Sequence, residues 1–265
     1  MASKTLLIIA VAMACATGCD AAILSAGRND ARRLDVRFPV PQYYQDYAAR
    51  EGNPRPTTGR LLLLLPPNFD SRKVWPLLIV TATTDHGHTS PTDAPYYGAA
   101  AAAEGWVVLA TDATIRPRQD SVAWRLALLI AGLQLVHRDW PQSAKWPVVL
   151  GGFSGGAKCT EWLGAIMAQT HSANIRGLFL GGINDDRMPA ALQSNPAPPE
   201  FRAVPIWISS GIDDRIAPPP LEEEVAASLR RGGFSKVHLS RFRGGHELNR
   251  ADLQSALKWF RAETR

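Results

Sequence analysis

The sequence predicts an α/β fold in which a mostly parallel β-sheet is covered by helices on both faces. Three observations support this prediction: short apolar runs recur along the chain, segments with helical periodicity lie between them, and Pro, Gly or charged residues bound each run. Strands that alternate with helices are typical of parallel sheets, because each crossover helix packs on a face of the sheet. The 265 residues are 46% hydrophobic and 20% charged, which is ordinary for a globular domain with a substantial core.

The first residues, 1–18, are typical of a targeting segment. Lys4 is followed by the apolar run TLLIIAVAMA, which has the length of a secretory signal and is too short to span a bilayer. Small residues in ATGC then lead to Cys19, which resembles a bacterial lipoprotein signal, in which this cysteine is lipidated and becomes the new N-terminus. Simple cleavage nearby, or a frame that ends at Cys15, are the alternatives. A lipoprotein would be secreted across the cytoplasmic membrane and held by acyl chains at a membrane surface, in the periplasm or at the cell surface.

The cysteines and the charges argue against a disulfide-stabilised fold and against a nucleic-acid-binding protein. Cys15 and Cys19 lie in or at the edge of the signal, so Cys159 has no partner for a disulfide in the body of the chain. The formal charge of +5 comes from basic residues scattered as short pairs, and no basic stripe with interleaved aromatic residues occurs in the sequence. We therefore expect a fold held together by packing, with no nucleic-acid partner.

The body of the chain divides into a leading segment and one large domain. Residues 19–59 are rich in Arg, Pro and polar residues and are expected to form a tether and an N-terminal wrap, whereas residues 60–265 are expected to form one large α/β domain. The expected buried strands are RLLLLL, WPLLIV, GWVVLA, WPVVLGG, GLFLGG and VPIWISSG. Helices are expected at 94–104, 121–138 and 156–170, between Pro220 and Gly232, and after Asn249, which can cap the last helix.

The connection before the strand VPIWISSG limits the size of any cap, meaning an inserted helical segment that covers the ends of the strands. About twenty residues, rich in Pro, separate the strand that ends near Gly182 from the strand that begins at Val204. A connection of this length has little room for a large helical cap. We therefore expect a minimal cap and an open site.

The stretch LGGFSGGAK, residues 150–158, places four glycines around one serine, between an expected strand and an expected helix. In a Gly-x-Ser-x-Gly turn the serine adopts a strained backbone conformation, and side chains two residues before and after it would collide with the turn. Gly152 and Gly156 occupy these two positions. The turn would lift the Ser154 hydroxyl clear of the sheet at a helix N-terminus, where developing negative charge is stabilised. Ser154 is therefore the candidate nucleophile.

A nucleophilic serine needs a general base and an acid that orients the base. His246 follows the last expected strand, in RGGHEL, and is the candidate base. The acid is expected after VPIWISS, in GIDDRIAPP, where both Asp213 and Asp214 are possible. Asp185 and Asp186, after GLFLGG, are outside candidates. The resulting order along the chain is Ser, Asp, His.

With these residues in place, the chain from about residue 60 to 265 resembles the α/β-hydrolase superfamily. The runs LPPNFDSRKVWPLLIV and AAAEGWVVLATD resemble its polyhydroxybutyrate-depolymerase-like or feruloyl-esterase-like branch. In such enzymes the acid commonly lies in a Gly-x-x-Asp-x-x-x-Pro turn, which falls here on Gly211, Asp214 and Pro218 and favours Asp214. The resemblance implies an α/β-hydrolase fold and a serine esterase that needs no cofactor. Ser154, His246 and Asp214 would form its triad, working through an acyl-enzyme.

Such an enzyme also needs two donors for the oxyanion of the tetrahedral intermediate. One is expected to be the backbone amide of Gly155, the residue after the nucleophile. The other should follow the strand WPLLIV, where the family often has His-Gly and this chain reads TATTDHGHTS. Without an insertion, Thr84 takes the donor position; with a longer loop, His86-Gly87 takes the family role and His88 donates. We favour Thr84.

The same loop raises the possibility of a metal site. His86 and His88 lie next to Asp85, but a metal needs three or more convergent ligands. The sequence has no Cys or His cluster elsewhere that would supply them. No metal is expected.

Two functions from different classes fit these residues. The first is a serine esterase tethered to a bacterial membrane surface through Cys19 and acting on a small-molecule or polymeric ester. The alternative is a non-catalytic binding lipoprotein that retains the hydrolase scaffold. The intact Ser, Asp and His set favours the esterase, whereas the departure at TATTDHGHTS favours the binding protein.

Overall fold

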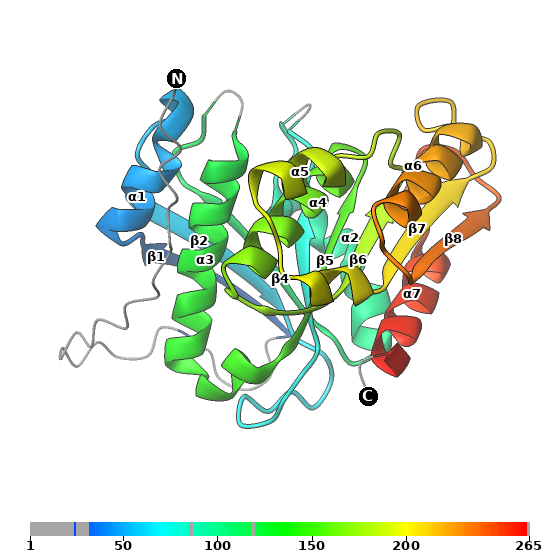
Figure 1. Cartoon of the computed structure of the whole chain (residues 1–265). Coiled ribbons are helices and arrows are strands. Elements are labelled where there is room, and N and C mark those ends of the chain that lie inside the picture. The colour runs from blue at the N-terminus through cyan, green and yellow to red at the C-terminus, as the bar shows by residue number, and fades with distance from the viewer. Residues whose placement is uncertain (1–23, 25–31, 85–86, 118–119, 264–265) are drawn as a thin grey trace, which may run out of the picture.

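The computed structural model describes residues 24, 32–84, 87–117 and 120–263, and Figure 1 shows its cartoon. The expected signal peptide, Cys15 and Cys19 lie outside the described residues, as do Asp85 and His86. Within the described part of the chain, no helix is long and apolar enough to cross a membrane.

An eight-stranded sheet forms the centre of the molecule, with strand order β1-β2-β4-β3-β5-β6-β7-β8. β1 and β2 pair antiparallel with each other and β2 pairs antiparallel with β4, while the other neighbouring strands are parallel. The mostly parallel sheet predicted from the sequence is confirmed. The strands are β1 (Arg33–Pro39), β2 (Thr58–Leu64), β3 (Leu77–Thr81), β4 (Val107–Ala113), β5 (Pro147–Phe153), β6 (Asn174–Gly181), β7 (Ile206–Gly211) and β8 (Val237–Phe242).

Helices cover both faces of this sheet (Figure 1). They are α1 (Gln42–Ala48), α2 (Ser90–Ala103), α3 (Val122–Asp139), α4 (Gly155–Gln169), α5 (Met188–Ser194), α6 (Pro219–Arg231) and α7 (Arg250–Glu263). Successive residues of β3 alternate between two apolar cores: Leu77 and Ile79 pack with α3, α4 and α6, whereas Leu78 and Val80 pack with α2 and α7. This alternation is the two-residue period of a strand that is buried on both faces.

The sheet begins earlier than the sequence analysis expected. Residues 33–39, placed there in the tether and wrap, form the edge strand β1 and pair with β2 over seven residues. Leu34 and Phe38 of this strand are buried in the core. The antiparallel pairing lets a short, half-polar strand join the sheet without a crossover helix.

The cap is small, as predicted. Between β6 and β7 the chain forms the two-turn helix α5 and a short 3-10 helix, Pro199–Ala203. The turns after the parallel strands β3, β5, β6 and β7 therefore meet at the carboxyl edge of the sheet, which is where open α/β sheets bind their ligands.

Candidate active site

Ser154 lies in the sharp turn between β5 and α4. Its backbone has φ 56° and ψ −120°, a region that residues with a side chain rarely adopt. The Ser154 amide donates a hydrogen bond to the Gly181 carbonyl over 2.8 Å, which ties the turn to strand β6. The serine is thus held in a strained conformation at the start of a helix, as the Gly-rich motif predicts.

The glycines on either side of Ser154 are required by close backbone contacts. A Cβ atom on Gly152 would lie 2.3 Å from backbone atoms of Gly156, and a Cβ atom on Gly156 would lie 2.3 Å from the carbonyl oxygen of Thr81. The buried hydroxyls of Thr81 and Thr160 lie 2.7 and 3.0 Å from the Gly156 carbonyl oxygen. Strand β3 and helix α4 therefore clamp the turn together. The glycine motif predicts the turn, whereas no sequence pattern indicates that Thr81 and Thr160 contact it.

Asp214 and His246 come together from the turns that follow the neighbouring strands β7 and β8. Oδ2 of Asp214 lies 2.7 Å from Nδ1 of His246, and the Asp214 side chain is 1% exposed. Oδ1 of Asp214 accepts hydrogen bonds from the amides of Ile216 (2.7 Å) and Ala217 (2.8 Å). Burial would raise the pKa of Asp214, but the Ala217 amide, His246 and the Ile216 amide together lower it below its ordinary value. The group is therefore a carboxylate at neutral pH.

The His246 ring lies beside the turn that carries Ser154. The ring of Phe153, which directly precedes the serine, has its centroid 4.6 Å from that of His246. A Cβ atom on Gly182, just after β6, would lie 3.1 Å from Cε1 of His246. Because Nδ1 of the ring faces Asp214, Nε2 is the nitrogen that can serve a second partner.

The sequence analysis also considered other aspartates as the acid that orients His246, and these do not contact the histidine in the same way. Asp213 is exposed, although it directly precedes Asp214. Asp185 forms an ion pair with Arg187 over 2.5 Å. Asp214 is therefore the acid that the geometry gives to His246.

Asp186 is half-buried and lies beside a fully buried acid that sequence reasoning missed. Its partner is Glu161 of α4, which is 0% exposed and accepts a hydrogen bond from the Arg187 amide over 2.7 Å. Burial raises the pKa of Glu161 well above its ordinary value, and the Asp186 carboxylate adds to this rise. The pair joins α4 to the loop after β6, which also carries Gly182. A glutamate inside an apolar helix face was the one available signal.

The segment after β3, expected to supply the second oxyanion donor, packs on the start of α4. A Cβ atom on Gly155 would lie 2.5 Å from Oγ1 of Thr83, so Thr83 is in direct contact with the residue after the nucleophile. Thr84 is exposed. Its role as a donor stays a prediction.

His88, considered in the sequence analysis as a metal ligand, has another partner. Nδ1 of His88 lies 2.9 Å from Oδ1 of Asp93 in the first turn of α2. Among the residues that the structure describes, no group of three or more His, Cys, Asp or Glu side chains could hold a metal ion.

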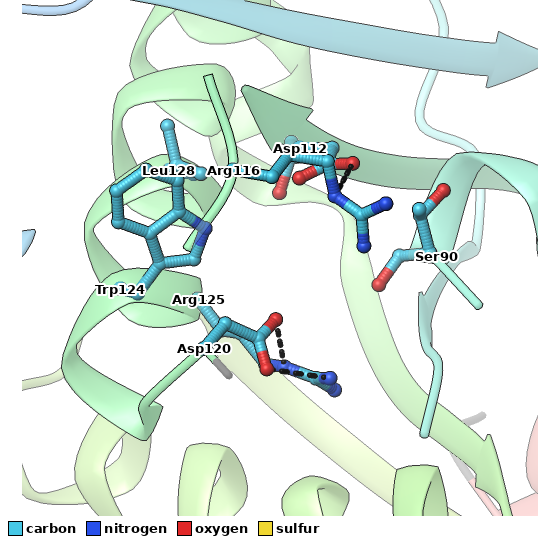
Figure 2. Close-up of a pocket in the computed structure, with 9 residues that line it drawn as sticks. Ser90, Asp112, Arg116, Asp120, Trp124, Arg125 and Leu128 are labelled. Carbon is cyan, nitrogen blue, oxygen red and sulfur yellow. Dashed lines mark hydrogen bonds and ion pairs between the residues drawn. The ribbon is translucent and has the colours of Figure 1, made fainter. Parts of the chain in front are cut away.

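A small polar pocket lies beside the segment after β3 (Figure 2). Two ion pairs dominate it: Arg125 of α3 with Asp120, at 2.8 Å, and Arg116 with Asp112, at 3.0 Å. Its lining residues are Thr89, Ser90, Thr111, Asp112, Arg116, Asp120, Trp124, Arg125 and Leu128. The sequence patterns did not indicate this pocket, because its charges come from segments that no motif connects.

Comparisons with known proteins agree with this architecture. No family model matches the chain, and no curated protein sequence matches it. Among solved structures, a bacterial heroin esterase is similar, with a TM-score of 0.61 and 15% identity, covering 91% of this chain and 88% of that one. A fluorophosphonate-binding serine hydrolase of Staphylococcus aureus, in a substrate-bound structure, has a TM-score of 0.57 and 14% identity, covering 86% and 97%. A butyrate-bound esterase of the planctomycete Thermogutta terrifontis has a TM-score of 0.52 and 15% identity, covering 82% and 90%. The chain has the α/β-hydrolase fold.

Proposed function

We propose that this chain is a serine hydrolase that cleaves carboxylic esters through Ser154, His246 and Asp214. The observation that carries the proposal is the pair formed by the buried Asp214 and the half-buried His246, joined at 2.7 Å, beside a serine held at φ 56° at the start of a helix. A strained serine, an imidazole and an ionised acid gathered at the carboxyl edge of one sheet are the parts that acyl transfer needs.

The proposed reaction follows the acid–base roles of these groups. Nε2 of His246 takes the Ser154 proton as the hydroxyl oxygen attacks the ester carbonyl, and the same nitrogen then protonates the leaving alcohol. Asp214 accepts a hydrogen bond from Nδ1–H of His246, so it keeps the ring in the useful tautomer and stabilises the imidazolium. Water activated by His246 releases the acid and restores Ser154. The oxyanion is held by the Gly155 amide and by a donor from the segment after β3, where the sequence favours Thr84.

The similar structures support an ester as the substrate. Two of these proteins are esterases, one of them with bound butyrate, and the third is a serine hydrolase that binds fluorophosphonates. The small α5 region leaves the site open, which suits either a small-molecule ester or a polymeric one.

Labelling with a fluorophosphonate probe tests the chemistry, because the probe forms a bond with an activated serine. Wild-type protein should be labelled and should hydrolyse p-nitrophenyl acetate or butyrate, whereas Ser154→Ala and His246→Ala should lose both activities. Ser255→Ala, which alters an exposed hydroxyl in α7, is the matched control and should behave as wild type. A folded wild-type protein with neither labelling nor turnover would contradict the proposal and favour a non-catalytic binding lipoprotein.

We also propose that Cys19 is lipidated and tethers the protein to a bacterial membrane surface, in the periplasm or at the cell surface. The support is the sequence alone, in which Lys4, a short apolar run and small residues precede Cys19. Expression of the full chain in a bacterial host with radiolabelled palmitate tests this. Cys19→Ser should abolish label and release the protein from membranes, whereas Cys15→Ser should not; loss of label in Cys15→Ser alone would favour the other frame.

A further inference from the structure

We propose that Arg125 is a positioning residue that orients the second oxyanion donor, and that this donor is the backbone amide of Thr83 in place of Thr84. The inference rests on the proposed esterase function and deepens it. Neither residue belongs to the Gly-rich motif or to the Ser, Asp and His set.

Arg125 reaches from α3 to the backbone of the segment after β3. Its Nη1 donates a hydrogen bond to the carbonyl oxygen of Ala82. Its Nε and Nη2 bind the two carboxylate oxygens of Asp120, at 2.8 and 3.1 Å, and Figure 2 shows this paired contact. The Arg125 side chain is only 11% exposed, so the guanidinium is fixed in a largely dry site. A paired contact of this kind fixes the plane of the guanidinium as well as its position.

Ala82 is held from its other side as well. Its amide donates to Oγ of Ser90 over 3.3 Å, and the residue is 1% exposed. A Cβ atom on Gly156 would lie 3.0 Å from the carbonyl carbon of Ala82, so this peptide group packs directly on the first turn of α4. The peptide between Ala82 and Thr83 is therefore fixed against the turn that carries Ser154.

Because that peptide is planar, the hydrogen bond from Arg125 to the Ala82 carbonyl also fixes the direction of the Thr83 N–H. No peptide bond in the described residues is cis, and in a trans peptide the carbonyl and the following N–H point to opposite edges of one plane. Because Arg125 binds the Ala82 carbonyl, the Thr83 N–H points away from α3. Thr83 also contacts Gly155, whose amide is the first donor. The two proposed donor amides thus belong to residues that are in contact with each other.

The guanidinium also makes that amide a better donor. A cation that hydrogen-bonds to a carbonyl draws electron density through the peptide, which strengthens the hydrogen bond made by the N–H of the same group. Lysine could supply the charge but not the fork that binds Asp120 and Ala82 together. The thiol of Cys159 also lies against the Arg125 guanidinium. Burial raises the pKa of this thiol, and the positive charge of Arg125 partly offsets the rise.

The neighbouring Arg116 provides a matched control. It lines the same pocket and carries the same charge, yet it pairs with Asp112 at 3.0 Å and donates to the carbonyl of His88 at 3.1 Å. Removing Arg116 therefore changes the charge of the pocket without touching Ala82.

The test compares Arg125→Met, Arg125→Lys and Arg116→Met for hydrolysis of p-nitrophenyl butyrate and for inhibition by a boronic acid. Because loss of one oxyanion donor costs about 100- to 1,000-fold in kcat, a misoriented donor should lower kcat about 10- to 100-fold in Arg125→Met, with KM within about 3-fold. Boronic-acid affinity should fall by a similar factor, because the tetrahedral adduct uses the oxyanion site. Arg125→Lys should recover little, and Arg116→Met should resemble wild type.

Thermal unfolding and circular dichroism establish that each variant is folded. If Arg125→Met does not fold, Arg125→Lys and Asp120→Asn decide the matter: in each variant kcat and boronic-acid affinity should fall together, by a similar factor. A folded Arg125 variant with wild-type kcat and wild-type boronic-acid affinity would overturn the role of Arg125 while the esterase stands. Wild-type protein that neither turns over esters nor labels with fluorophosphonate would overturn both proposals.

Discussion

At the scale of single residues, the turn around Ser154 tolerates no side chain at Gly156. An alanine there would bring its Cβ atom 2.3 Å from the Thr81 carbonyl oxygen, so β3 and α4 would have to separate. We expect Gly156→Ala to lower the free energy of unfolding by about 3 kcal/mol or more, in the range of severe core substitutions. Urea unfolding followed by circular dichroism measures this change. Gly245→Ala is the control, because a Cβ atom at Gly245 meets nothing within 4 Å, and equal effects of the two changes would contradict the prediction.

A second prediction at this scale concerns Glu222, a fully buried residue of α6 near Asp214. Burial raises the pKa of Glu222 from 4.5 to about 7; the Ser210 hydroxyl opposes this rise and the Asp214 carboxylate adds to it. Because the unfolded chain releases this proton at lower pH than the folded chain, stability from the protonated group is full below pH 4.5 and is lost as pH rises to about 7.

Glu222→Gln removes this titration while it keeps the shape of the protonated carboxyl group. The stability of the variant relative to wild type should therefore increase between pH 4.5 and 7, by up to about 3 kcal/mol, and level off above pH 7. Urea unfolding at pH 5, 6, 7 and 8 measures the difference. Parallel pH profiles for the two proteins would show that Glu222 does not titrate in this range.

The residues of the candidate site differ in how well the sequence predicts them. Ser154 and its glycines lie within a few positions of one another, so local sterics alone identify them. His246 and the acid are found because each follows an expected strand, although choosing between Asp213 and Asp214 required the hydrogen bond to His246. Thr83 and Arg125 meet Gly155 and Ala82 only through packing of separate elements, and no local pattern encodes such contacts.

At the scale of elements, helix α7 is attached to the sheet through a buried carboxylate at its first turn. Asp252 is 8% exposed; Oδ2 accepts a hydrogen bond from the Trp207 indole over 3.1 Å, and Oδ1 accepts from the Ser240 hydroxyl over 2.5 Å. Asp252→Ala should lower the free energy of unfolding by about 2 to 4 kcal/mol, because it leaves the buried Trp207 indole and the half-buried Ser240 hydroxyl without this acceptor. Asp252→Asn, which keeps an acceptor, should lower it by less.

The helix cap next to Asp252 provides a reference for that measurement. Oδ1 of Asn249 accepts from the Asp252 amide over 2.9 Å, which confirms the cap predicted from the sequence. Asn249→Ala should lower the free energy of unfolding by about 1 kcal/mol, as loss of an N-cap usually does. Chemical denaturation of the three variants decides the ranking, and an Asp252→Ala protein no less stable than Asn249→Ala would contradict it.

Element boundaries were less predictable than element types. α2 begins at Ser90 rather than near residue 94, because Thr89 caps it: its Oγ1 accepts from the Thr92 amide over 3.1 Å, and the Thr92 hydroxyl accepts from the Thr89 amide over 2.8 Å. A Pro-containing start, with apolar periodicity only later, hides this first turn. β1 was missed because Pro and Arg flank a short strand whose partner is a distant run of leucines.

At the scale of the whole molecule, the parallel part of the sheet gathers the candidate site. Ser154, Thr83, Asp214 and His246 each follow the carboxyl end of a different strand, and those strands are neighbours in the order β3-β5-β6-β7-β8 with β6 between. Strand order was not predictable from the sequence, because apolar runs show which segments are buried but not which ones pair. The proposed chemistry thus depends on the crossover topology as much as on the motif.

The same topology makes β1 a protective edge for the leucine-rich strand β2. β1 carries Arg33 and Asp35 on its exposed positions, and Asp35 forms an ion pair with Arg60 of β2 over 2.7 Å. Charged residues on a short edge strand disfavour pairing with another chain. Without β1, the run TGRLLLL would become the edge, with free backbone groups and high β-propensity.

Two truncations test this protective role. A chain that begins at residue 32 keeps β1 and should remain monomeric, whereas one that begins at residue 42 lacks it and should aggregate. The second chain also loses the buried Phe38 ring, whose atoms lie as close as 2.4 Å to where a Cβ atom on Gly59 would be, so its sheet is left with a cavity as well as an open edge. Size-exclusion chromatography with light scattering distinguishes the two effects, because a cavity alone lowers the melting temperature without creating large species. A monomeric chain from residue 42 would show that the β2 edge needs no cover.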